Sequence, residues 1–123
     1  MKITTFNPQI ISKDAESIAK FFEELGFEKK HNKNDFSEEI VGIRMKNKDG
    51  FSLDISQTDM IPVPAVPAIR MNVDNFDEAY EILKKYGYEN FYGDKTVKST
   101  SSRSAMMMSP SKIPINLVEH IKK

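Results

Sequence analysis

Several features that identify common classes of protein are absent from this 123-residue sequence. It has no cysteine, so it has no thiol nucleophile, no thiolate ligand for a metal ion and no disulfide. No segment approaches the ~18 apolar residues of a membrane span, and residues 1–14 contain no apolar run typical of a secretion signal. These absences predict a soluble, cytoplasmic protein that does not bind a membrane.

An excess of charge of one sign is also absent. Eighteen Lys and Arg residues balance eighteen Asp and Glu residues, and the two signs are interspersed along the chain. A nucleic-acid-binding surface needs a concentration of positive charge, so the sequence predicts no nucleic-acid partner. The length fits one domain, 1–123, that buries a core without covalent cross-links.

The first half of the sequence has the pattern of a β-α-β-β-β unit. Apolar residues recur every three or four positions between Asp14 and Leu25, with Asp14 suited to cap this helix and Gly26 suited to end it. The segment 31–35 is polar and predicts a loop. Strands are expected at 3–12, where Pro8 indicates an edge or a bulge, briefly after Gly26, at 38–47 and at 50–56.

The second half repeats this plan after the proline-containing segment 57–67, which predicts a semi-rigid linker. A strand at 68–73 precedes a helix, for which Asn75 and Glu78 have the spacing of a capping box. Gly87 ends this helix as Gly26 ends the first. Further strands are expected at 104–109 and 113–120, the first of them preceded by a loop at 94–104.

A period of about 61 residues therefore predicts one supersecondary unit used twice. The predicted fold is α+β, with two βαβββ modules, 1–56 and 68–123, that form a curved mixed sheet around a cavity. In this arrangement a helix covers one face of each module's sheet. Strand alternation assigns two sets of side chains to opposite faces. We expect the apolar set under the helices and the other set in the cavity, respectively Phe51, Leu53, Ile55, Ile113, Ile115, Leu117 and Ser52, Asp54, Pro114, Asn116.

Four stretches carry a resemblance to a known superfamily. They are KDAESIAKFFEELGF, DGFSLDIS, IRMNVDNFDEAYEILKKYGY and RSAMMMSPSKIPINLVEH, and together they span most of the chain. In this order they resemble the vicinal oxygen chelate superfamily, which includes glyoxalase I, extradiol dioxygenases and bleomycin-resistance proteins. The first stretch is most similar in spacing to the bleomycin-resistance branch, so the resemblance implies a glyoxalase/bleomycin-resistance-like fold.

In metal-dependent members of this superfamily, the resemblance implies four metal ligands, from the first and last strands of each module. The matching positions here are Phe6 or Asn7, then Asp54, Ala68 and Asn116. Asp54 is the one ionisable residue among them, whereas Zn²⁺, Ni²⁺ and Fe²⁺ sites use imidazole and carboxylate donors. The sequence therefore predicts no metal ligands and no cofactor.

The remaining candidates are polar or adaptable side chains that strand parity directs into the cavity. Arg70 alternates with the apolar Ile69 and Met71, so its guanidinium is expected either to grip an anionic group or to pair with Asp54. Met107 either lines the cavity or fills the core. The predicted ligand-binding residues are Gln9, for which Ile11 is the alternative, with Arg44, Asp54, Arg70, Asn72, Arg103, Met107 and Asn116.

Three functions are compatible with these features. The first is a metal-independent protein that binds or sequesters a small molecule with polar and apolar parts. Three arginines and zero net charge argue against bleomycin itself, because the resemblance implies an acidic cavity for that cationic antibiotic. The second is a glyoxalase-like lyase or dioxygenase-related enzyme whose atypical metal site uses Asn7 and Asp54, and the third is an interaction scaffold. The resemblance also implies a homodimer.

Overall fold

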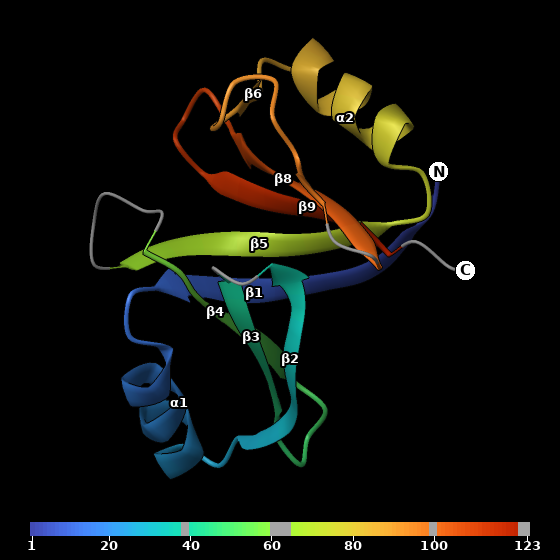
Figure 1. Cartoon of the computed structure of the whole chain (residues 1–123). Helices are drawn as coiled ribbons and strands as arrows, with labels where there is room; N and C mark the ends of the chain where they lie inside the picture. Colours follow the sequence, from blue (N-terminus) through green and yellow to red (C-terminus); the bar gives the residue numbers. More distant parts are fainter. Residues whose placement is uncertain (38–39, 60–64, 99–100, 121–123) are drawn as a thin grey trace. The chain divides into compact units, whose positions relative to one another are not determined.

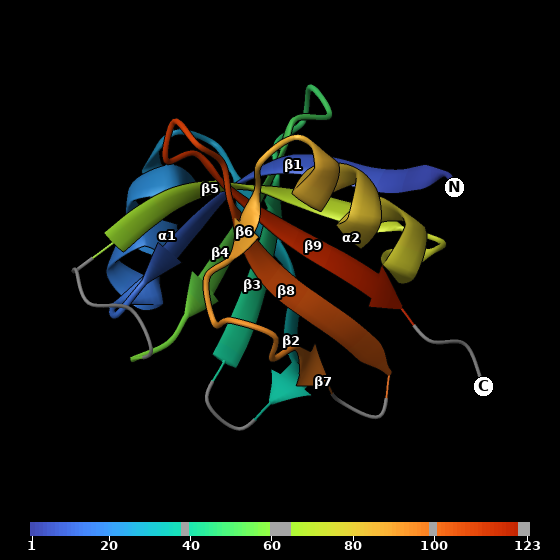
Figure 2. The same cartoon turned by 90° about the horizontal axis from the view of Figure 1, so that it is seen from above.

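The computed structural model describes residues 1–37, 40–59, 65–98 and 101–120. The chain divides into two compact units: Asn7–Pro67, called here the N-terminal unit, and Met1–Phe6 with Ala68–Lys123, called the C-terminal unit. The helices and strands within the described residues are labelled in Figure 1, except for β7, which is labelled in Figure 2. They are β1 (Ile3–Ser12), α1 (Ala15–Glu24), β2 (Glu28–Ser37), β3 (Ile40–Lys46), β4 (Ser52–Gln57), β5 (Ala65–Val73), α2 (Phe76–Lys85), β6 (Glu89–Asn90), β7 (Val97–Lys98), β8 (Ser102–Met108) and β9 (Pro114–His120).

The N-terminal unit packs α1 against one face of a sheet with strand order β2-β3-β4-β1. Strands β1 and β4 are parallel, whereas β2-β3 and β3-β4 are antiparallel. The parallel pair requires a long connection, which α1, β2 and β3 supply. Small alanines on α1 let the helix approach the aliphatic side chains of the strands. The buried core contains Ala15, Ala19, Ile43, Met45, Leu53 and Ile55.

The C-terminal unit repeats this arrangement with α2 and the strand order β5-β9-β8-β6, and β7 also pairs with β8. Strands β5 and β9 are parallel, and β8 is antiparallel to β9. Figure 2 shows α2 alongside β9, with which it makes contact. The buried core under α2 contains Met71, Val73, Phe76, Ala79, Ala105, Met107, Ile115 and Leu117.

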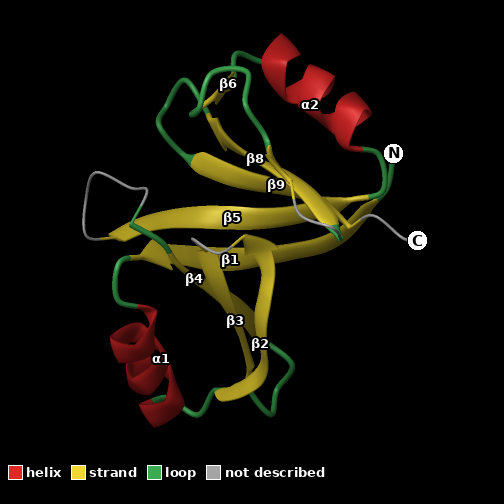
Figure 3. Ribbon diagram, in the orientation of Figure 1, coloured by secondary structure: helices red, strands yellow, loops and turns green. Residues whose placement is uncertain are grey.

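The N-terminal unit has the β-α-β-β-β order that the sequence repeat predicts, the C-terminal unit has the same order with the short strand β7 added, and the α+β class is confirmed. Figure 3 shows α1 and α2 in red against the yellow strands of their units. No helix within the four described ranges is both long enough and apolar enough to cross a membrane. The cavity expected between the two modules stays a prediction.

Asp14 caps the start of α1 as the sequence predicts, and its carboxyl group titrates with a shifted pKa. The Asp14 carboxylate accepts hydrogen bonds from the Ser17 hydroxyl at 2.6 Å and from the Ser17 backbone N–H at 3.3 Å. The hydroxyl bond is the largest of the effects that hold the pKa of Asp14 below its usual value, ahead of the backbone bond and the nearby charge of Lys20. Because the folded state lowers this pKa, the cap stabilises the fold above the unfolded-state pKa. That contribution is lost as the pH falls through the folded-state pKa.

Replacing Ser17 with alanine should raise the pKa of Asp14 toward its usual value, because the hydroxyl donor is removed while the backbone donor remains. An NMR titration that follows the Asp14 carboxyl carbon measures this change. Ser17→Thr is the control, since it keeps a hydroxyl and should keep the low pKa. An unchanged titration in Ser17→Ala would show that the hydroxyl does not stabilise the carboxylate.

Three boundary predictions from the sequence were wrong. The predicted loop at 94–104 contains β7 and the first residues of β8. The polar segment 31–35 lies within β2, where Asn32 pairs with Ile43 and Lys33 with Gly42. Its side chains suggested a loop, but an edge strand gains its stability from backbone pairing and tolerates charged residues. Strand β5 begins at Ala65, so residues 65–67 of the predicted linker are extended, while its residues 60–64 lie outside the described residues.

Phe51 and Ile113 are exposed, which corrects the prediction that both pack under the helices. Their side chains are 67% and 52% exposed, whereas Leu53 and Ile115 are buried as predicted. Each exposed residue immediately precedes its strand, β4 or β9. The prediction extended the alternating pattern one residue before the start of each strand. A side chain at that position is not covered by the helix.

Candidate functional site

A row of polar residues crosses the sheet of the N-terminal unit on the face opposite α1. In the strand register Gln9 of β1 lies beside Asp54 of β4, and Arg44 of β3 lies on the other side of Asp54. Their neighbours in sequence, Leu53 and Ile55, pack under α1, so alternation directs the row away from the helix. The structure therefore brings together three of the residues that the sequence predicted.

Asp54 is the centre of this row. Its side chain is only 4% exposed, and it accepts a hydrogen bond from the Asn7 amide at 3.0 Å. Arg44 donates through Nε to the other carboxylate oxygen at 3.2 Å and keeps 39% of its side chain exposed. The pair is thus asymmetric, with a buried anion and a cation that reaches solvent. A charge-assisted pair of this kind fixes the carboxylate and leaves further guanidinium donors for other acceptors.

Gln9 has a hydrogen-bonding capacity that the protein does not use. Its side chain is 1% exposed, and Nε2 donates to the Ser56 hydroxyl at 2.8 Å. Within the part of the chain that the structure describes, the amide oxygen Oε1 is buried and has no hydrogen-bond partner. A buried acceptor without a donor costs about 1–3 kcal/mol, and most native structures avoid it. Sequence reasoning missed Ser56, although its parity with Asp54 places it on the same face.

The C-terminal unit carries the matching row on the face opposite α2. Arg70 of β5 lies beside Asn116 of β9, and Asn116 lies beside Met106 of β8. Arg70 is 6% exposed and donates through Nε to Asn72 at 3.1 Å. Asn72 is 3% exposed, so an arginine and an amide are buried together. The pairing of Arg70 with Asp54 stays a prediction, since these residues belong to different units.

Arg103 and Met107 lie on the other face of β8, under α2, which corrects their predicted place in the cavity. Arg103 pairs with Asp77 at 2.9 Å, and its guanidinium lies 4.3 Å from the centre of the Phe76 ring. Met107 is fully buried in the core with Phe76, which is the core-filling alternative. Because residues 106–108 are all methionine, the sequence does not show which face of this strand α2 covers.

The residues at the four positions where the superfamily resemblance implies metal ligands are poor donors for a metal ion. Asn7, not Phe6, contacts Asp54, and it presents its amide N–H rather than its oxygen to the carboxylate. The C-terminal positions offer Ala68 and the amide of Asn116, with the cationic Arg70 beside that amide. Among residues 1–37, 40–59, 65–98 and 101–120, no three His, Cys, Asp or Glu side chains are grouped to hold a metal ion. This donor set does not fit a divalent transition metal.

The sequence matches no protein-family model and no curated protein. Several solved structures have a fold similar to that of this chain. A hypothetical protein from Bacillus halodurans aligns with a TM-score of 0.69 and 11% identity over 100% of this chain and 98% of that protein. Methylmalonyl-CoA epimerase from Mycobacterium tuberculosis aligns with a TM-score of 0.67 and 14% identity over 98% and 90% of the two chains.

A second methylmalonyl-CoA epimerase structure has a TM-score of 0.63 and 18% identity over 94% of each chain. These similarities extend along almost the whole chain, while the identities are too low to transfer an activity. The epimerases belong to the vicinal oxygen chelate superfamily. A special likeness to the bleomycin-resistance branch stays a prediction. The chain therefore has the glyoxalase-like fold of the vicinal oxygen chelate superfamily, as the order of its sequence motifs predicts.

Proposed function

We propose that this protein binds a small molecule with polar and apolar parts and does so without a metal ion. The observation that carries the proposal is the unpaired amide oxygen of Gln9, buried beside the Asp54 and Arg44 pair. A purely structural sheet face gains nothing from an acceptor that lacks a donor, whereas a binding site requires unused polar groups in a dry environment.

The polar row also indicates the chemistry of the ligand. Gln9 Oε1 accepts from an N–H or O–H group of the ligand. Arg44 is half exposed, so it can donate to a carboxylate or carbonyl while its Nε stays bonded to Asp54. Ile11 is 5% exposed and lies next to Ser56 in the strand register, which adds an apolar surface to the same face. A small molecule with a donor, an acceptor and an apolar portion meets these requirements.

Replacing Gln9 with leucine should abolish ligand binding while leaving the ligand-free protein as stable as the wild type, within about 1 kcal/mol. Leucine removes the unpaired acceptor, which offsets the lost bond to Ser56. A thermal-shift screen of metabolites identifies the ligand, and a titration then compares the two proteins. At 100 times its dissociation constant the ligand adds about 2.7 kcal/mol of stability to the wild type.

Met45→Leu is the matched control, because Met45 is buried under α1 on the opposite face of the same sheet. This variant should respond to the ligand as the wild type does. A large loss of stability in ligand-free Gln9→Leu would show that Gln9 is a structural residue. Full ligand binding by Gln9→Leu would contradict the proposed site.

The alternative is a glyoxalase-like lyase or dioxygenase-related enzyme with an atypical metal site that includes Asn7 and Asp54. The enzymes that share the fold are the reason to test it. Elemental analysis of protein purified without chelators distinguishes the two functions. One equivalent of a transition metal that is lost in Asp54→Ala would support the enzyme and contradict metal-independent binding.

The proposal includes a cytoplasmic homodimer. The absence of cysteine suits a reducing compartment, and the superfamily resemblance implies a two-fold dimer. Light scattering after size-exclusion chromatography tests the assembly, for which a mass of about twice the 14.1 kDa chain is expected.

A further inference from the structure

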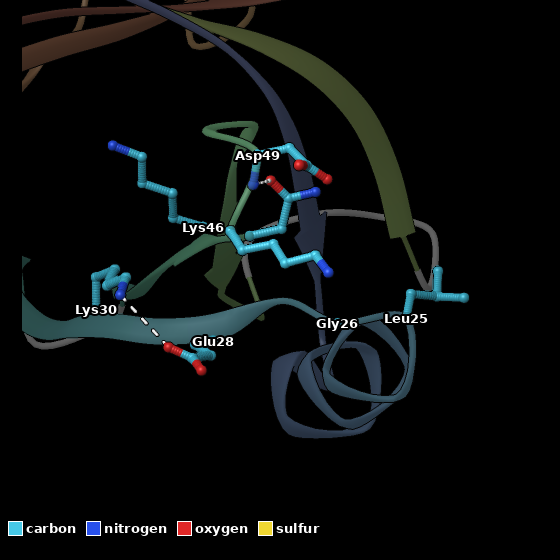
Figure 4. Close-up of a pocket in the computed structure, with 8 residues that line it drawn as sticks. Leu25, Gly26, Glu28, Lys30, Lys46 and Asp49 are labelled. Atoms are coloured by element: carbon cyan, nitrogen blue, oxygen red, sulfur yellow. Dashed lines mark hydrogen bonds and ion pairs between the residues drawn. The ribbon is translucent and has the colours of Figure 1, made fainter.

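A pocket of about 340 Å³ opens at one end of the N-terminal unit, where the end of α1 meets the turn between β3 and β4. Figure 4 shows the side chains of Lys30, Lys46 and Glu28 around this pocket, with Leu25 at its edge. None of the residues of the polar row lines it. The complete lining is Leu25, Gly26, Glu28, Lys30, Lys46, Asn47, Lys48 and Asp49.

The C-terminal unit is an internal comparison for this pocket, because it repeats the same elements. In the strand register Glu28 of β2 lies opposite Lys46 of β3, and at the equivalent place Glu89 of β6 lies opposite Met108 of β8. Gly87 follows α2 as Gly26 follows α1. A Cβ added to Gly87 would lie 2.9 Å from the Pro110 ring, whereas a Cβ added to Gly26 would meet nothing within 4 Å. We call the place where the end of the helix meets the turn before the following strand the corner of each unit. The Pro110 ring fills this corner beside Gly87, whereas the corner beside Gly26 is open.

The side chains that surround the two corners also differ in charge. Lys30, Lys46 and Lys48 surround the open corner, whereas Phe91, Met108 and Pro110 occupy the equivalent positions of the closed corner. Lys30 pairs with Glu28 at 3.5 Å. Within the described ranges, Lys46 and Lys48 have no ion-pair partner. The corner of the C-terminal unit is thus filled by the apolar Pro110 ring, whereas the corner of the N-terminal unit is an open pocket whose lining includes Lys46 and Lys48.

One apolar side chain lines this pocket, and two exposed aromatic residues belong to the neighbouring helix and turn. Leu25 lines it and is 59% exposed, and Phe21, one helical turn earlier on α1, is 60% exposed. Phe51 exchanges two hydrogen bonds with the lining residue Asn47, through the Asn47 backbone N–H at 3.0 Å and the Asn47 side chain at 2.9 Å. The lining therefore has an excess of one positive charge, with three lysines against Glu28 and Asp49, and it includes the exposed apolar side chain of Leu25.

We propose that this pocket binds a small organic anion, a phosphate ester or carboxylate with a short apolar group. The anion contacts the ammonium groups of Lys46 and Lys48, and the apolar group lies against Leu25. The volume, near the lower end of the range for small-molecule sites, suits a compact ligand. This site is distinct from the polar row and does not depend on the function proposed for it.

An NMR titration of ¹⁵N-labelled protein with n-butyl phosphate tests the proposal. Saturable shifts are expected at the backbone amides of Gly26, Asn47, Lys48 and Asp49. Raising the salt concentration from 0.05 to 0.5 M should weaken binding, because exposed charges are screened. Parallel titrations with pentanoate and inorganic phosphate identify the preferred head group and the contribution of the apolar chain.

The double variant K46E/K48E should weaken binding by at least about tenfold, since it reverses both unpaired charges. K84E/K85E is the matched control: it makes the same change of charge on α2, in the C-terminal unit, and should leave binding unchanged. Circular dichroism verifies that both variants fold. Gln9→Leu should bind n-butyl phosphate normally, so this site and the polar row fail or succeed separately.

Three results would overturn the proposal. The shifts could increase linearly without saturation, they could persist in K46E/K48E, or n-butylammonium could produce them equally well. Equal affinity for inorganic phosphate and n-butyl phosphate would contradict the apolar part of the site.

Discussion

Replacing Phe76 with alanine should lower the free energy of unfolding by about 3–5 kcal/mol, the usual cost of truncating a buried aromatic residue. The Phe76 side chain is 1% exposed at the first residue of α2. Its ring stacks on Tyr80 at a centroid distance of 5.6 Å and lies under the Arg103 guanidinium at 4.3 Å. Removing the ring leaves a cavity under the helix and also removes the apolar surface on which Arg103 rests. Urea denaturation measures the change.

Phe21→Ala is the matched control for this prediction, because the two substitutions remove the same atoms. Phe21 is 60% exposed on α1, so its truncation should change the stability by no more than about 0.5 kcal/mol. Similar costs for the two variants would contradict the assignment of Phe76 to the core and of Phe21 to the surface.

Replacing Asp54 with alanine should destabilise the protein by about 1–3 kcal/mol, the cost of leaving hydrogen-bonding groups without their partner. The substitution removes the acceptor of both the Asn7 amide and the Arg44 guanidinium. The cost stays below that of a fully buried ion pair, because the Arg44 side chain is 39% exposed and regains water. Urea denaturation of Asp54→Ala, compared with the wild type, measures it.

A double-mutant cycle with Arg44→Ala isolates the part of this cost that belongs to the ion pair. We expect a favourable coupling between Asp54 and Arg44, since the carboxylate is buried and held in one orientation. Additive effects of the two single substitutions would show that the pair contributes nothing to stability. Asp54 would then not stabilise the fold through its ion pair with Arg44.

Local sequence patterns predicted most of the secondary structure. The helices and their capping residues Asp14 and Asn75 were identified correctly, because helix periodicity and capping depend on residues within a few positions of one another. The repeat of about 61 residues likewise predicted two equivalent units. The segment 31–35 was missed, because its strand depends on pairing with β3 and not on its own composition.

The candidate site was predicted in part. Strand alternation correctly directed Asp54, Arg44 and Arg70 to the faces opposite the helices, since side chains on a strand alternate by geometry alone. Arg103 and Met107 were assigned to the wrong face, because their sequence neighbours are too similar to show which side α2 covers. The unused oxygen of Gln9 was not visible in the sequence at all, since it depends on the position of Ser56 on another strand.

The sequence by itself determined the two βαβββ units, the ends of their helices and the alternating faces of most strands, because each of these depends on residues close together in the chain. The tertiary structure decided which polar groups meet and which stay unpaired. It also decided which of two equivalent corners is closed by Pro110 and which is left open beside Gly26. Those outcomes depend on contacts between strands and turns far apart in sequence, where a single side chain determines whether space is filled.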